Sequence, residues 1–447
     1  MKKIKKKIKG STSRRSYARL PLTLALGAMV LTPTMISLDS SEAEAAVTVR
    51  EGTSIGIRGD AEVRGFTRDN TDFDDRTNRD DLNRQIQHRM RIAMDVQAAG
   101  GTSLHTRLHL AGDLHRDRRD VWGADRMDRH ANVVADYLFV RVPVGDFKIT
   151  AGRQMTHWGH GLKIDDGTRV DLLQVDHKVD DQTNVFASYQ KDIESQRLAP
   201  GVNRSDDRDL NRYAIGVVHK TPELQFGVKL RHTDDRRVAQ PAVVAAAGED
   251  GQELLAFATY ERGDLTTKIE ADFGFGDFHE SAAGDEKHAV FLGFDYALGD
   301  TTLHLNGVWG AHGYRGSGDG DAFERVSMFY YGGDGLAHSG FGGAFGGATD
   351  REFGVSFGAS HELSPALSLS GRLAHLDGEN VSPVGADRIT GWNATVLDAT
   401  MSYRINASTS YRINAIYAKP DFDQVAGATA RPDDAYWGLS HALRIRF

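Results

Sequence analysis

The sequence predicts an all-β protein, folded as a transmembrane antiparallel up-and-down β-barrel of about 18 strands. Three observations predict it. Apolar and polar residues alternate along runs of about 10–13 residues, short turns alternate with long polar segments, and the chain closes on an alternating run that ends at Phe447. A strand tilted across a membrane needs about 9–11 residues, whereas strands in soluble proteins usually have about 5–6.

The alternation is clear in residues 86–98, where one face carries Ile86, Met90 and Ile92 and the other carries Arg89 and Arg91. Successive side chains of a strand point to opposite faces, so one face of each strand is apolar. In lipid every backbone polar group must be paired within the protein, so such strands can span a membrane only as a closed ring. A ring of about 18 strands leaves an aqueous lumen. A soluble β-sandwich or propeller would need shorter strands and a recurring blade motif, and the sequence shows neither.

Short turns and long polar segments divide the chain. The turns lie near Gly100 and Gly101, Gly145 and Asp146, Asp180 and Asp181, Pro222 and Glu223, Gly263 and Asp264, Gly299 and Asp300, Ser364 and Pro365, and Asn406 and Ala407. These eight turns join sixteen strands, and residues 53–66 and 434–447 add one strand at each end. Segment 324–332 also has a strand-like pattern, but we place it inside the long loop 313–350. Short turns are expected on the periplasmic side and long loops on the extracellular side.

The composition excludes several classes of protein. The 447 residues include no Cys, 54 Lys and Arg, and 62 Asp and Glu. A disulfide scaffold, a thiolate metal site and a Cys nucleophile are therefore excluded. A polytopic helical membrane protein is disfavoured because it needs several apolar runs of about 20 residues.

Residues 1–45 are expected to be a cleaved secretory signal peptide. Nine basic residues precede an apolar stretch, which is followed by the A-x-A pattern Ala43-Glu44-Ala45. A retained membrane anchor is the alternative. Arg14 and Arg15 resemble a twin-arginine signal, which leaves the choice of export route open. The remaining domain, 46–447, carries a net charge of −14 and is not expected to bind nucleic acid.

The polar face of the strands predicts a lumen enriched in basic residues. The strand parities place fifteen basic and ten acidic residues on that face. A tight hairpin brings together Arg89, Arg91, Arg107, His105 and His109, which we expect to form one basic patch along the path of the solute. The other predicted lumen residues on this path are Lys229, Arg231, Arg372, Arg404, Arg412 and Arg444. Arginines that line a pore attract anions. The alternative is that these charges only hydrate the lumen and pair across strands.

Other segments carry weaker signals. Loop 313–350 contains three Gly-Gly pairs with Phe341 and Phe345 between them, and it either folds into the barrel as a constriction or stays outside. His157 and His160 have no third ligand, so no metal site is expected. No Ser-His-Asp arrangement, Walker loop or zinc signature stands out. Neither enzymatic activity nor a cofactor is expected.

The segment from Phe147 to Gln154, followed by the residues His157 to Leu162, resembles the "strand, G-R-Q, then W/Y-G-x-G-L" segment of alginate-export-like outer-membrane porins. The resemblance covers about 20 residues and implies a channel for anionic polysaccharide or small acidic solutes with an arginine-lined lumen. Arg153 corresponds to the arginine of that segment, although its parity is that of the apolar positions Ile149 and Ala151. The terminal Phe447 resembles the assembly signal that the barrel-assembly machinery of bacteria recognises.

The sequence thus predicts an outer-membrane porin for passive diffusion of small hydrophilic, anionic solutes or acidic saccharides. Its expected partners are the lipid and lipopolysaccharide of the outer membrane and the barrel-assembly machinery. The alternative function is a structural or adhesion barrel with a plugged pore. The solute, the pore radius and a homotrimeric assembly are left open by the sequence.

Overall fold

The computed structural model describes residues 45–50, 52–69, 83–111, 120–121, 133–162, 164, 168–193, 209–235, 250–277, 287–311, 325–328, 349–384, 389–424 and 433–447. All but the last residue of the expected signal peptide, and most of loop 313–350, lie outside the described residues. Among the residues that the structure describes, no helix is long and apolar enough to cross a membrane.

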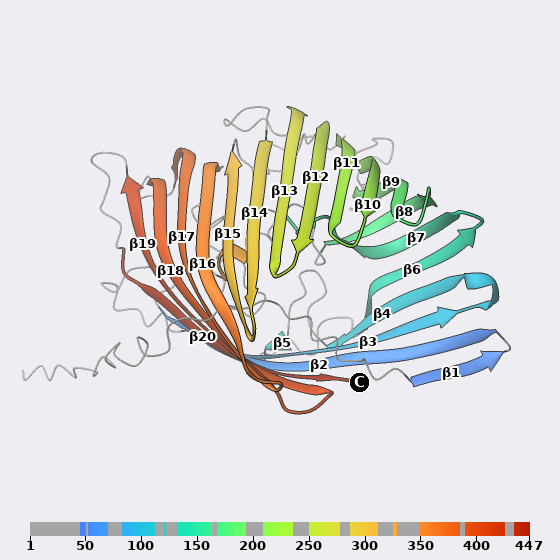
Figure 1. Ribbon diagram of the computed structural model, residues 1–447, viewed down its shortest axis with the longest axis horizontal. Helices are drawn as coiled ribbons and strands as arrows, with labels where there is room; N and C mark the ends of the chain where they lie inside the picture. The colour runs from blue at the N-terminus through green and yellow to red at the C-terminus, as the bar shows by residue number, and fades with distance from the viewer. Residues whose placement is uncertain are drawn as a thin grey trace, which may run out of the picture.

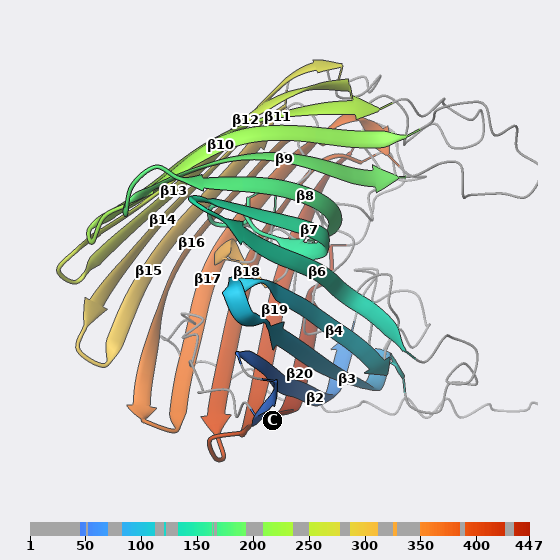
Figure 2. The ribbon, with the colours of Figure 1, turned by 90° about the vertical axis from the view of Figure 1, so that its right-hand side faces the viewer.

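The described chain forms a closed antiparallel barrel of 18 strands, as predicted (Figures 1 and 2). The wall strands are β2 (Thr53–Asp69), β3 (Asn83–Gln97), β4 (Ser103–Ala111), β6 (Val134–Val144), β7 (Phe147–Thr156), β8 (Thr168–Lys178), β9 (Thr183–Ile193), β10 (Leu210–Lys220), β11 (Leu224–Asp235), β12 (Asp250–Arg262), β13 (Leu265–Asp277), β14 (Lys287–Leu298), β15 (Thr301–Ala311), β16 (Thr349–Ser364), β17 (Leu367–Val384), β18 (Ile389–Arg404), β19 (Thr409–Gln424) and β20 (Tyr436–Arg446). Two short strands lie beside the ring. β1 (Ala45–Arg50) pairs with β2, and β5 (Asp120–Val121) pairs with β3.

The ring closes where β20 pairs with β2, with a register that runs from Asp60 opposite Arg446 to Asp69 opposite Trp437. The last residue extends this seam between β2 and β20, because Phe447 and Gly59 exchange backbone hydrogen bonds of 2.6 and 3.0 Å. β1 continues along the same edge of β2, with Ala45 opposite Ile57. In Figure 1, β20 and β2 run side by side at the bottom of the ring. Closure leaves no unpaired wall edge facing hydrocarbon.

Each wall strand turns one face inward and one outward, with the predicted alternation. Along β20, the exposed residues include Trp437 and Leu439, whereas Gly438 and Ser440 are buried. Large apolar side chains such as Phe357 and Leu373 are 57% exposed on the outer face. A band of this kind suits contact with lipid.

The eight predicted turns all join neighbouring wall strands. Gly145 and Gly299 adopt positive φ angles of 60° and 62° at two of them. At another, the carboxylate of Asp180 accepts hydrogen bonds from the backbone N–H groups of Gln182 and Thr183 at 2.8 and 2.7 Å. The hydrogen bond from Gln182 lowers the pKa of Asp180, so this contribution to stability is lost as the pH falls through that lowered pKa.

The strands β16 to β19 have 16 to 18 residues, which is longer than the predicted runs. The ends of these strands next to the long loops carry charged residues on the outer face, where Arg351 donates a hydrogen bond to Glu379 at 2.6 Å. A strand of about 9–11 residues spans the hydrocarbon, so these ends extend beyond it. Segment 325–328 is not a wall strand, in agreement with the placement of 324–332 inside the loop.

The seam gives a test of the packing around the last residue. A Cβ atom at Gly59 would lie 2.6 Å from the Phe447 ring, whereas one at Gly307 would have only the Gly354 carbonyl oxygen within 4 Å, at 3.8 Å. We expect Gly59→Val to lower the free energy of unfolding by about 1–3 kcal/mol, because overpacking forces neighbours to shift. Urea titration of the folded barrel, read by its gel mobility, measures this. Gly307→Val is the matched control, and equal loss in both variants would contradict the seam argument.

Candidate functional site: the inner face of the barrel

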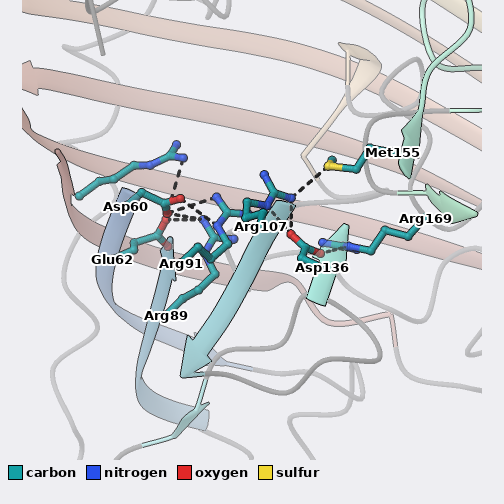
Figure 3. Close-up of polar contacts among 9 residues, drawn as sticks. Asp60, Glu62, Arg89, Arg91, Arg107, Asp136, Met155 and Arg169 are labelled. Atoms are coloured by element: carbon teal, nitrogen blue, oxygen red, sulfur yellow. Dashed lines mark hydrogen bonds and ion pairs between the residues drawn. The ribbon is translucent and has the colours of Figure 1, made fainter. Parts of the chain in front are cut away.

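The inner faces of β2, β3 and β20 bring three arginines to one carboxylate (Figure 3). The Asp60 carboxylate accepts from Arg91 Nε at 2.8 Å and lies 3.6 Å from Arg89 and 3.8 Å from Arg444. Arg89 also contacts Glu62 at 3.3 Å. Alternation along each strand and the pairing of β2 with both β3 and β20 produce this arrangement. Among these five groups, three guanidinium groups surround two carboxylates.

Arg107 lies in a second cluster, beside β6, β7 and β8. Asp136 is the common partner of Arg107 and Arg169, and Arg107 also donates to the sulfur of Met155 at 3.0 Å. The register between β4 and β6 shifts at Arg107, which leaves Asp136 as the extra residue of a bulge. A bulge re-aims a side chain, and here it turns a carboxylate toward two guanidinium groups. This cluster also has one more cation than anions among its named members.

The remaining hairpin residues lie near these clusters. The ring of His105 stacks on Phe139 with centroids 4.8 Å apart, and His109 is only 3% exposed. The two clusters and these histidines lie on the inner face of neighbouring strands, from β20 and β2 to β8. The structure therefore brings the predicted hairpin residues together, but with carboxylates between them.

The other predicted pathway residues are spread around the ring. Arg231 pairs with Glu253, and Arg372 contacts Asp398 at 3.1 Å. Lys229 lies 4.6 Å from the centre of the Trp158 ring. Arg404 and Arg412 are exposed at the short-turn end, where Arg404 donates to the Pro365 carbonyl at 2.6 Å. Cross-strand pairing, the alternative that the sequence left open, accounts for Arg231 and Arg372.

A short segment, of which residues 157–162 and Ile164 are described (called residues 157–164 below), folds inward between β7 and β8. The Glu270 carboxylate accepts hydrogen bonds from the backbone N–H groups of His160 and Leu162 at 2.6 and 3.2 Å. Gly159 has a φ of 60°, and a Cβ atom there would lie 2.7 Å from Cδ of Glu270. Only glycine fits this position without strain.

Aromatic packing holds the same segment. Trp158 packs edge-on against Phe257 with ring centroids 5.2 Å apart. Burial lowers the pKa of His160 to about 4, so its ring is neutral at pH 7. His157 is exposed, and the described residues hold no group of three potential metal ligands. The His160 ring lies 6.0 Å from the Phe257 ring and 5.8 Å from the Phe291 ring, whereas Nε2 of His157 lies 2.9 Å from the Gly159 carbonyl oxygen.

A second segment, residues 325–328, also lies inside the barrel. Val326 and Ser327 are fully buried. The Arg325 carbonyl accepts from the Asn306 amide at 3.2 Å and from Arg372, and the Met328 N–H donates to Asp398 at 3.0 Å. Part of loop 313–350 thus lies against the inner wall, its last two residues begin β16, and the other residues of the loop fall outside the described residues.

The inner face near these segments is apolar, which the sequence analysis did not foresee. Leu162 and Val326 belong to one buried cluster with side chains of the wall, and the larger of these are Phe291, Val308, Leu376, Trp392, Val396, Ile416 and Tyr436. The wall positions share the inward parity of charged residues such as Asp398. The inner face of β14 to β20 therefore carries an apolar cluster beside charged pairs such as Arg372 and Asp398.

Arg153, the residue singled out by the family resemblance, lies on the outer face. Its side chain is 48% exposed and sits 3.6 Å from Asp171 of β8, next to the exposed Leu173. Its parity already placed it with the apolar positions. Strand parity already placed Glu270 on the lumen face, but sequence reasoning missed its contact with the inward segment and missed Asp136, because that inward fold and the bulge at Asp136 arise only from tertiary contacts.

Comparisons with known proteins bear on the fold. No known family and no curated protein matches the sequence. Solved structures do match. OpdK of Pseudomonas aeruginosa, solved with vanillate, is 13% identical with a TM-score of 0.53 over 88% of this chain and 98% of its own. OpdL of the same organism is 9% identical with a TM-score of 0.55 over 88% and 98%.

A BenF-like porin from Pseudomonas fluorescens Pf-5 is 11% identical, with a TM-score of 0.53 over 88% of this chain and 99% of its own. Identities this low show the fold alone. The chain has the fold of bacterial outer-membrane porins, and the predicted location in the outer membrane agrees with that fold. The narrower resemblance to alginate-export-like porins stays a prediction.

The inward segment gives a test that is independent of transport. We expect Glu270→Ala to release residues 157–164 and to shift the emission of Trp158 to longer wavelength, because charge-assisted hydrogen bonds of about 1.5–3 kcal/mol each are lost. Fluorescence with acrylamide quenching measures this, and a Trp158→Phe background assigns the change. Glu270→Gln, which keeps an acceptor oxygen, is the control. An unchanged spectrum in Glu270→Ala would show that packing alone holds the segment.

Proposed function

We propose that the protein is an outer-membrane channel for passive diffusion of small hydrophilic, anionic solutes or acidic saccharides. The observation that carries this proposal is that guanidinium groups outnumber carboxylates among the named members of the Asp60 and Asp136 clusters. Both clusters lie on the inner face of a closed barrel. A confined site with surplus positive charge attracts anions and repels cations. The porin fold of the solved neighbours supports a channel, and they are channels rather than enzymes.

The arginines in these clusters have two roles in the proposal. Pairing with Asp60, Glu62 and Asp136 fixes the guanidinium groups in position, since a buried ion pair restricts both side chains. In the proposal, the positive charge of these fixed groups attracts an anion that passes.

The charge excess predicts a change of ion selectivity. We expect the triple variant Arg89→Gln, Arg91→Gln and Arg107→Gln to shift the reversal potential toward cations, because three positive charges leave the inner face while Asp60, Glu62 and Asp136 stay. Planar-bilayer recordings in a salt gradient measure this. Arg153→Gln, on the outer face, is the matched control. An unchanged reversal potential in the triple variant would remove these arginines from the ion path.

A charge-balanced double substitution distinguishes an electrostatic effect on ion selectivity from a loss of local structure. Arg91→Gln alone should reduce anion preference, whereas Arg91→Gln combined with Asp60→Asn removes one cation and one anion and should restore most of it. Removal of one partner of a buried pair costs about 3–5 kcal/mol, so folding of each variant is checked by heat-dependent gel mobility. Equal selectivity in the single and double variants would contradict an electrostatic origin.

A plugged structural or adhesion barrel is the second candidate. The two inward segments and their apolar contacts across the lumen favour it, since together they occupy part of the interior. Conductance of the purified barrel separates the two functions, because a plugged barrel gives no channel events. Vanillate, which is named in the structure of the neighbour OpdK, is a suitable anionic test solute for competition with chloride current.

A further inference from the structure

Three side chains of the β3–β4 hairpin form a hydrogen-bonded array that the channel proposal does not use. Ser103 and His105 are the first and third residues of β4, so they point to the same inward face. Asp95 of β3 lies directly opposite His105 in the register. All three are close to the turn at residues 99–101, which places them at the short-turn mouth of the lumen.

The hydrogen bonds of this array have a defined direction. Nδ1 of His105 lies 2.5 Å from the Asp95 carboxylate, and Nε2 lies 2.8 Å from Oγ of Ser103. A carboxylate can only accept, so Nδ1 carries a hydrogen, and in the neutral ring Nε2 carries the lone pair. In that state the Ser103 hydroxyl donates to Nε2. This is the arrangement in which a histidine acts as general base toward a serine nucleophile.

The groups around the array add positive charge and a flat apolar surface. The His105 ring stacks on Phe139, whose ring also has the Arg141 guanidinium carbon 4.9 Å from its centre. Arg141 is the direct partner of Ser103 in the β4–β6 register and is exposed. Arg58 contacts Asp95 at 3.2 Å. Because backbone N–H groups of the wall are engaged in the sheet, a side chain such as Arg141 must supply the donors for a developing oxyanion.

We propose that Ser103, His105 and Asp95 form a hydrolytic site for small esters of acidic or neutral acyl groups at the mouth of the lumen. Ser103 Oγ attacks the carbonyl carbon while His105 Nε2 takes its proton. The ester C–O bond breaks, and the leaving alcohol takes that proton from His105. Water then attacks the acyl-serine, His105 takes the proton of the water, and the carboxylic acid leaves as Ser103 regains its hydrogen. Water is the only co-reactant.

Access sets the size of the substrate. Ser103 is 7% exposed, and the His105 and Asp95 side chains are 20% and 22% exposed. The nucleophile is therefore less accessible than the two groups that activate it, so the proposed site admits only slender acyl groups. The exposed Arg141, opposite Ser103 in the register, favours those that carry a carboxylate.

The barrel contains a second array that serves as an internal control. His304 Nδ1 lies 2.5 Å from Asp295, and its Nε2 lies 3.3 Å from Oγ of Ser360. This serine–histidine distance exceeds the range of 2.5–3.0 Å that is usual for hydroxyl hydrogen bonds to oxygen and lies at the limit for nitrogen. The His304 side chain is 6% exposed, and Lys268 binds the same aspartate at 2.5 Å. We therefore expect hydrolysis at Ser103 and none at Ser360.

The test uses the purified, folded full-length barrel. It is incubated with a fluorophosphonate probe, the labelled residue is located by mass spectrometry, and release of nitrophenol from p-nitrophenyl acetate and p-nitrophenyl succinate is followed. We expect the label on Ser103 and a loss of at least about 100-fold in hydrolysis for Ser103→Ala and for His105→Ala, the range typical of a lost nucleophile or general base. Ser360→Ala should hydrolyse both esters as the unchanged protein does.

The outcomes separate this activity from transport. Ser103→Ala should keep its conductance and its heat-dependent gel mobility, so that lost hydrolysis is not lost folding. Absence of label from Ser103 in a folded, conducting barrel would overturn the proposal. Equal hydrolysis by Ser103→Ala and the unchanged protein would overturn it as well, and so would full labelling of Ser103 in His105→Ala, because the histidine would then have no part in activating the serine.

Discussion

The closed backbone ladder between β2 and β20 is the constraint on which the rest of the structure depends. In hydrocarbon no water is available to an unpaired N–H or C=O, so the first and last wall strands must meet in register. Here that register runs from Asp60 to Asp69 on β2, and the terminal Phe447 completes it through Gly59. Once the ring is closed, alternation along every strand sends one side chain outward and the next inward. The apolar outer face and the charged inner clusters are both consequences of this closure.

Closure also decides how the charges of the inner wall interact. Asp60 meets arginines from β3 and β20 only because β2 has both strands as neighbours. A charge buried without a partner is costly, so carboxylates placed between arginines stabilise the arrangement while a surplus of positive charge remains. The lumen is therefore not a uniform basic surface. It has clusters in which the named guanidinium groups outnumber the named carboxylates, and a separate buried cluster of aromatic and aliphatic side chains.

The two inward segments narrow the interior by different means. Residues 157–164 depend on one carboxylate, Glu270, and on a glycine that permits its close approach. Residues 325–328 depend on Asp398 and on the Arg325 carbonyl, which bonds to wall side chains. Backbone groups inside a barrel must find partners just as those of the wall do, and polar wall residues supply them. These contacts link the lumen charges to the shape of the passage.

The sequence alone determined the closed barrel, the 18 wall strands and the positions of the eight turns, because a period of two and the residues that favour turns are local properties. It also placed Arg89, Arg91 and Arg107 on one hairpin face, and the parity of Arg153 already pointed outward. The tertiary structure alone decided that Asp136 bulges toward two arginines, that Glu270 holds residues 157–164, and that Asp95 completes an array with Ser103 and His105. Those contacts depend on bulges, register and chain segments far apart in sequence, and alternation carries no information about them.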